Sequence, residues 1–159
     1  MDKIVELLKQ NARLTDRQLA AMLGTTEKDV HDRISKLEND GIIKGYSAII
    51  DESIYEPDKV SAIIELKVTP QADSGFDEIA KAVTQYDEVE SVVLVSGAYD
   101  LAITVSGTSL KTVADFVAQR LSAIHGIIST ATHFTLKTYK EKGIMVTEEI
   151  HDERGFVSP

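Results

Sequence analysis

The 159-residue chain lacks several features that would point to other classes of protein. It contains no cysteine, which excludes a disulfide framework, a thiolate metal site and a cysteine nucleophile. No apolar run is long enough to cross a bilayer, and the first residues lack the basic start and apolar core of a secretory signal. These absences predict a cytoplasmic protein with no membrane partner.

The chain also lacks the basic excess that is typical of a DNA-binding protein, because its formal net charge is −9. Residues 1–46 nevertheless carry eight Lys/Arg and eight Asp/Glu, which leaves nine of the 17 basic and eighteen of the 26 acidic residues for the rest of the chain. A neutral segment joined to an acidic one predicts two domains with different partners. Phosphates would repel the acidic domain, so only the first segment is a candidate for binding a DNA duplex.

Helical spacing of apolar residues predicts three helices in residues 1–45. Polar N-cap residues precede the second and third helices, and glycines stand where these helices end. Two short helices around a glycine-containing turn form a helix-turn-helix, although a plain three-helix bundle has the same spacing. The cap and stop residues are Thr15 with Gln18, Gly24, Thr26 and Gly41.

The third predicted helix buries Val30, Ile34 and Leu37 and turns a polar row outward. A helix of this size fits the major groove, where polar side chains reach base edges. Arg33 lies nearer the buried side, where it reaches a phosphate or anchors the turn. Asp29 and Asp32 are unusual opposite phosphates; they either accept from cytosine amino groups or moderate affinity. The outward row is Lys28, Asp32, Ser35 and Asn39, and the candidate DNA-contacting residues are Thr26, Lys28, His31, Asp32, Arg33, Ser35 and Lys36.

The remainder of the chain is predicted to be a linker, residues 46–59, followed by an α+β domain, residues 60–159. The order β-α-β-β-α-β is ferredoxin-like: a four-stranded antiparallel sheet with two helices on one face. The other face stays uncovered, which predicts homodimerisation. The predicted elements are strands at 60–68, 89–95, 100–105 and 127–139, helices at 76–83 and 110–124, and short extended pieces at 46–50 and 144–150.

Three segments resemble one family of regulators. Residues 23–48, LGTTEKDVHDRISKLENDGIIKGYSA, resemble the helix-turn-helix signature of the leucine-responsive regulator/AsnC (Lrp/AsnC) family of transcription factors. Residues 95–105, VSGAYDLAITV, are similar to the Gly-x-Tyr-Asp hairpin of that family's effector domain, and residues 125–132 are similar to its final strand. The resemblance implies a winged-helix-like head, sequence-specific binding to double-stranded DNA, and a response to a small effector, an amino acid. It also implies a homodimer that assembles into a higher even-numbered oligomer, a tetramer or octamer.

The same resemblance nominates an effector site between dimers. In the family, the hairpin and threonines of the last strand line this pocket. We expect Gly97 to adopt backbone angles closed to other residues. Asp100 is expected to need a donor from a neighbouring subunit, a ligand or water. Alternatively, Gly97 only makes the turn, and its neighbours stabilise the hairpin and an interface. The nominated residues are Gly97, Ala98, Tyr99, Asp100, Thr130 and Thr132.

Other functional classes find little support in the residues. The four histidines show no i, i+3 or i, i+4 spacing, which disfavours a metal-responsive repressor. No nucleophile is paired with a base and no phosphate-binding glycine loop occurs, so neither an enzyme nor a cofactor site is expected. The remaining alternative is an amino-acid-binding oligomeric module with little DNA activity.

Overall fold

The computed structural model describes residues 2–70 and 75–147. The chain divides into two compact units, Met1–Ile49 and Ile50–Pro159. None of the helices formed by the described residues is long and apolar enough to span a membrane.

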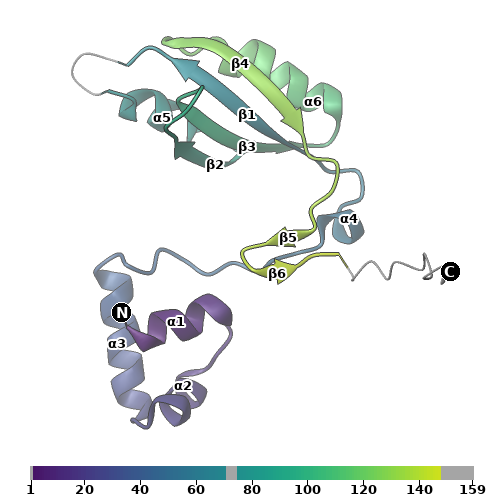
Figure 1. Cartoon of the computed structure of the whole chain (residues 1–159). Helices are drawn as coiled ribbons and strands as arrows, with labels where there is room; N and C mark the ends of the chain where they lie inside the picture. The colour runs from purple at the N-terminus through teal and green to yellow at the C-terminus, as the bar shows by residue number, and fades with distance from the viewer. Residues whose placement is uncertain (1, 71–74, 148–159) are drawn as a thin grey trace, which may run out of the picture. The chain divides into compact units, whose positions relative to one another are not determined.

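The first unit consists of three helices, as the apolar spacing predicts (Figure 1): α1 (Lys3–Gln10), α2 (Asp16–Leu23) and α3 (Glu27–Asn39). The predicted capping box is present, because Thr15 Oγ1 accepts from Gln18 N at 3.2 Å and Gln18 Oε1 accepts from Thr15 N at 2.9 Å. Gly24 ends α2 with φ of 67°, a left-handed conformation that favours glycine. The buried side chains that join the helices are Ile4, Leu19, Ala20 and Val30.

The second unit contains the predicted ferredoxin-like sheet with strand order β2-β3-β1-β4, all neighbours antiparallel. Its helices α5 and α6 lie on one side of the sheet (Figure 1). The helix α6 continues directly into a π-helical segment, η1. The elements are α4 (Glu52–Tyr55), β1 (Val60–Val68), α5 (Asp77–Val83), β2 (Val89–Leu94), β3 (Leu101–Gly107), α6 (Leu110–Asp115), η1 (Phe116–Leu121), β4 (Ile127–Phe134), β5 (Lys140–Glu141) and β6 (Ile144–Met145).

The two faces of the sheet differ in what covers them. Alternate residues of β1 and β3, such as Ile64 and Ile103, are fully buried beneath Ile79, Val83, Val113 and Phe116 of the helical side. Residues of the opposite face remain exposed, including Ile63 at 47% and Val93 at 52%. The same face carries a contact between His133 Nε2 and a Glu65 carboxylate oxygen at 3.4 Å. Within one copy, half of the sheet therefore stays open to solvent.

Several predicted boundaries were wrong for a common reason: a strand needs a neighbouring strand for its backbone hydrogen bonds. Residues 46–50 form no strand, and neither described sheet includes them. The last long strand ends at Phe134 rather than near residue 139, because Phe134 pairs with Ala62 close to the start of β1. Of the extended piece predicted at 144–150, residues 144–145 pair with β5, and residues 148–150 lie outside the described residues.

Candidate functional site

The helix-turn-helix places α3 beside the first turn of α2. Thr26 caps α3, since its Oγ1 accepts from Asp29 N at 3.2 Å. The turn before it follows from Gly24, beyond which Thr25 N donates to Ala20 O at 3.0 Å. Thr25 also donates its hydroxyl to Asp29 at 3.0 Å. These contacts fix the start of the helix that the sequence nominates for the DNA groove.

Two of the nominated side chains are held by carboxylates within the unit. The Arg33 guanidinium contacts Asp2 at 3.0 Å and Asp29 at 3.7 Å, so it joins the start of α1 to α3. His31 Nδ1 lies 3.1 Å from Asp16 Oδ2 in the first turn of α2. Both contacts orient α3 against its neighbours. For Arg33, this geometry favours the anchoring role over a reach toward phosphate.

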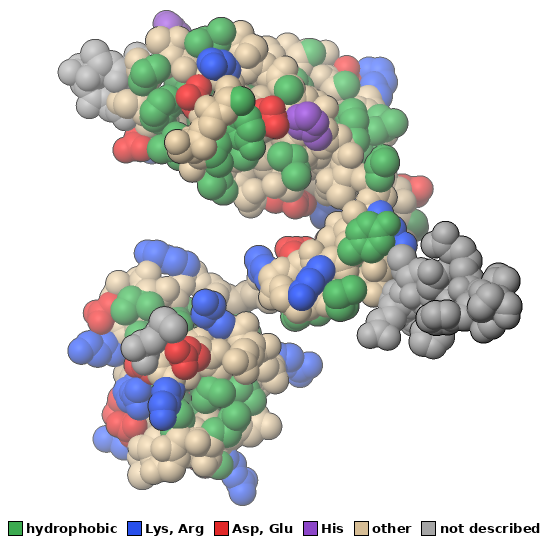
Figure 2. Space-filling view, viewed as in Figure 1, with side chains coloured by type: hydrophobic (Ala, Val, Ile, Leu, Met, Phe, Trp, Pro, Cys, Tyr) green, Lys and Arg blue, Asp and Glu red, His purple; other side chains and the backbone are tan. Residues whose placement is uncertain are grey.

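The outward row differs from the sequence prediction at one position. Ser35 was predicted to point outward but is half-buried. The exposed residues are Lys28, Asp32, Lys36 and Asn39. Lys28 and Asp32 lie one turn apart, with Nζ and a carboxylate oxygen separated by 3.9 Å. Lys36 makes no salt bridge within the described part of the chain. Figure 2 shows Lys and Arg side chains spread over the visible surface of this unit.

Asp2 is a charged group whose ionisation is tied to this architecture. Its Oδ1 accepts from Ile4 N at 2.9 Å, which caps α1, and also accepts from Arg33. The Ile4 amide, and then the Arg33 guanidinium, lower the pKa of Asp2 below its ordinary value, although burial opposes them. The ionised form of Asp2 is therefore the one that holds α1 and α3 together.

The second nominated region is the hairpin at residues 95–100, which crosses the end of β1. Val95 N donates to Asp100 O at 2.8 Å, and Asp100 N donates to Leu66 O at 2.9 Å. Lys67 Nζ donates to Ala98 O at 3.3 Å. Gly97 and Ala98 are exposed, while Tyr99 is half-buried. The hairpin is thus fixed at its base and presents backbone to solvent at its tip.

Two expectations about this hairpin were wrong. Gly97 does not have the positive φ that favours glycine, and a Cβ built there meets no atom within 4 Å. Asp100 already has a donor in its own chain, because its Oδ2 accepts from Val68 N at 2.9 Å. The carboxylate therefore satisfies a strand amide where the backbone pairing of β3 ends. Asp100 therefore has a structural role, the pairing of the Val68 amide, in addition to any ligand that it binds.

Thr130 and Thr132 do not join the hairpin in one copy of the chain. They pair with Leu66 and Ile64 of β1, and directly opposed residues point to the same face of a sheet. Both threonines therefore face the helix-covered side, on the edge strand. Lys67, which contacts Ala98, alternates with Leu66 and points to the open side. A site that includes all the nominated residues would need more than one copy.

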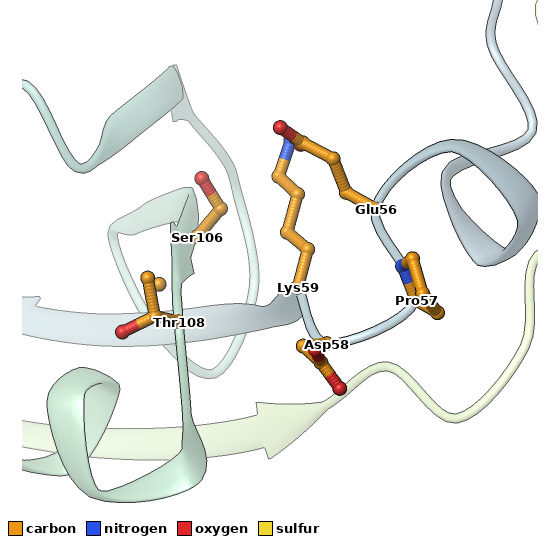
Figure 3. A pocket seen from close by; sticks show the side chains of 7 residues that line it. Glu56, Pro57, Asp58, Lys59, Ser106 and Thr108 are labelled. Atoms are coloured by element: carbon orange, nitrogen blue, oxygen red, sulfur yellow. The ribbon is translucent and has the colours of Figure 1, made fainter.

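A cavity of about 410 Å³ lies at the opposite end of β1 from the hairpin (Figure 3). It contains none of the nominated residues. Lys59 is held there by carboxylates of Glu52 at 3.3 Å, Glu56 at 3.9 Å and Glu90 at 3.1 Å. Within residues 2–70 and 75–147, no three His, Asp or Glu side chains gather as potential metal ligands. The cavity is lined by Glu56, Pro57, Asp58, Lys59, Ser106, Gly107 and Thr108.

Known families account for both units. Residues 3–44 match a model for winged helix-turn-helix DNA binding, and residues 61–145 match the Lrp/AsnC ligand binding domain. A DNA-binding head joined to a ligand-binding domain defines a transcription regulator that responds to a small molecule. The chain belongs to the Lrp/AsnC family.

Individual relatives cover almost the whole chain. The uncharacterized HTH-type transcriptional regulator YugG of Bacillus subtilis is 41% identical over 158 residues, 99% of this chain and 95% of the relative. The proline dehydrogenase transcriptional activator of Rhizobium radiobacter is 25% identical over 142 residues, 89% of this chain and 90% of that one. The solved L-Met complex of the transcriptional regulator NMB0573 from Neisseria meningitidis is similar with a TM-score of 0.70 and 25% identity, covering 87% of this chain and 89% of its own.

Sequence reasoning missed the partners that position the nominated side chains. Asp2 and Asp16 hold Arg33 and His31 across long sequence separations, and no local motif indicates such pairs. The position of Lys67 could have been predicted, because alternation along β1 places it on the open face near the end of the strand.

The Asp2 contacts predict acid-sensitive stability of the first unit. Because the pKa of Asp2 is lowered on folding, its contribution is present above its ordinary pKa, about 4, and is lost as pH falls through the folded value. Asp2→Asn should therefore destabilise the protein near neutral pH, and the difference from wild type should shrink as pH falls through the lowered pKa of Asp2. Unfolding followed by far-ultraviolet circular dichroism at several pH values measures this. An equal gap between the two proteins at every pH would contradict the prediction.

The Asp100 contact predicts a stability cost for Asp100→Ala. Val68 is only 4% exposed, so its amide would lose its partner in a buried position, at a cost of about 1–3 kcal/mol. Asp100→Asn keeps an oxygen acceptor and should cost less. Denaturant unfolding compares both with Asp58→Ala, an exposed carboxylate in the same unit. If Asp100→Ala is no less stable than that control, the carboxylate does not support the strand.

Proposed function

We propose that this regulator contacts the DNA major groove through α3 and responds to an amino acid bound at the hairpin of residues 95–100. The observation that supports this most is the hairpin itself: fixed at its base by Asp100 and open at Gly97 and Ala98. The similar Neisseria regulator was solved as a complex with L-Met, which supports an amino acid as the class of effector. A cytoplasmic location fits both partners.

The proposed DNA contacts divide by chemistry. Lys36 is suited to phosphate, since it is exposed and makes no salt bridge among the described residues. Lys28 and Asp32 face outward and are suited to base edges. Thr26 uses its hydroxyl oxygen as a cap and still has its hydroxyl proton to donate to a phosphate. His31, Ser35 and Arg33 contribute through the placement of α3.

The proposed effector site requires assembly of several copies. One copy places Thr130 and Thr132 on the face of the sheet opposite Lys67, so the hairpin of one protomer and the threonines of another would complete the site. Pairing of the open sheet faces would give the dimer, with Ile63 and Val93 becoming buried. Contacts between dimers would give a tetramer or octamer. A ligand shifts such an equilibrium only if its contacts differ between the assemblies.

DNA binding is expected to be salt-dependent and to depend on α3. Lys36→Ala should weaken binding to all sequences alike and lower the salt slope by about 1, because one phosphate contact is lost. Lys81→Ala, an exposed lysine of the second unit, is the control. Fluorescence anisotropy with labelled duplex over a range of salt concentrations measures both. Undiminished affinity in a Lys28→Ala, His31→Ala, Lys36→Ala triple variant would show that α3 does not occupy the groove, and absence of binding by wild type would favour the amino-acid-binding module.

The hairpin is expected to couple effector and assembly. A thermal-shift screen of the twenty amino acids first identifies a stabilising ligand. Gly97→Trp should then abolish the response to that amino acid and leave dimers, while binding to a single half-site survives. Open space around Gly97 means that the protomer should still fold. Light scattering with and without the amino acid measures assembly, with Gly97→Ala as a small matched control. A normal oligomer with normal response in Gly97→Trp would return the hairpin to a purely structural role.

A further inference from the structure

The described contacts of α3 point to one pair of side chains that selects a base. We infer that Asp32 and Lys28 together recognise a single C·G base pair in the major groove, with Asp32 accepting from the cytosine amino group and Lys28 donating to the guanine. This inference rests on the proposed function and adds base specificity to it.

The first support is that most other side chains of α3 that could read a base are held by partners or half-buried. His31 is held by Asp16, Arg33 by Asp2, and Glu38 accepts from Tyr46 at 3.0 Å. Asp29 is held by Thr25 and Arg33, and Ser35 is half-buried. Lys28 and Asp32 are the most open charged pair on the helix, with side chains 88% and 64% exposed. No other element of the unit competes for their charged ends within the described residues.

The second support is the match between the pair and the edge of a C·G base pair. Guanine presents two acceptors, O6 and N7, and cytosine presents one donor, its amino group. O6 and that amino group are hydrogen-bonded to each other, so they lie about 3 Å apart. The ammonium and carboxylate groups are 3.9 Å apart, which lets each meet its complement on one base pair. Adenine also has an amino donor, but that donor lies between two acceptors, N7 and thymine O4, whereas the cytosine amino group has an acceptor on one side only, so a carboxylate meets less repulsion at cytosine.

The third support is charge. A lone carboxylate near DNA phosphates is repelled, and once desolvated it needs a donor. Lys28 offsets the negative charge of Asp32, so the pair adds almost nothing to non-specific attraction. The free energy that the pair contributes to DNA binding therefore depends on the base that it contacts. This is the behaviour of a specificity contact and not of a phosphate contact.

Selection of binding sites from a pool of randomised duplex DNA tests the inference with the full chain. Wild type should enrich a motif with C·G at one fixed position, preferred about tenfold or more over other pairs. Asp32→Asn should change that position to adenine, because an amide pairs with adenine N6 and N7, and leave the rest of the motif intact. Asp32→Ala should lose preference at that position only. Circular dichroism confirms that the variants fold.

Glu27→Gln is the matched control, since Glu27 is an exposed carboxylate of the same helix that lies off the outward row. It removes one negative charge and should raise affinity for all sequences without changing the motif. If Asp32→Asn behaves in the same way, Asp32 acts through charge alone and the inference is overturned. A wild-type motif without C·G at a position sensitive to residue 32 also overturns it, while DNA binding stands. If wild type enriches no sequence, sequence-specific DNA binding itself fails.

Discussion

The pairing of β1 with two neighbours is the constraint on which the second unit depends. This strand lies between β3 and β4, and its register fixes which residues of all three strands face the helices. Ile64 and Leu66 are fully buried on that side, and a shift by one residue would expose them and bury Glu65 and Lys67. The same register determines where the hairpin and the two threonines stand. The candidate site is thus a consequence of packing in the core.

In the first unit, contacts with carboxylates decide which polar side chains of α3 remain available. The amphipathic pattern alone predicts an outward row of Lys28, Asp32, Ser35 and Asn39, because it distinguishes only inward from outward. Asp2 and Asp16 then hold Arg33 and His31, and the half-burial of Ser35 removes a further side chain from the open row. Where such contacts are exposed, as at His31, they contribute little stability, typically about 0–1 kcal/mol. Their effect here is on the orientation and availability of the charged groups.

The sequence predicted the fold more fully than the site. The spacing of apolar residues predicted both ends of β1 correctly and the ends of the three helices of the head to within a few residues. Thr15 and Thr26 cap helices and Gly24 ends one, as their chemistry indicates. These features depend on local geometry. The contacts of Asp100 with Val68 and of Arg33 with Asp2 join residues about thirty positions apart, and spacing carries no information on such pairs. The strand expected at 46–50 failed for a related reason: extended sequence becomes a strand only beside a partner.

The distribution of charge bears on how the two units would work together in the proposed assembly. A head whose basic and acidic residues balance, and whose Arg33 and Lys28 have carboxylate neighbours, has no excess of positive charge to attract phosphates. Since phosphate contacts supply most non-specific affinity, one such head would bind DNA weakly. Heads joined in the proposed assembly bind as a set, because the second contact becomes intramolecular once the first has formed. In the proposed assembly, weak heads would make the occupancy of DNA steeply dependent on assembly, so a ligand that changes assembly through the hairpin would control transcription without touching the helix proposed to contact the bases.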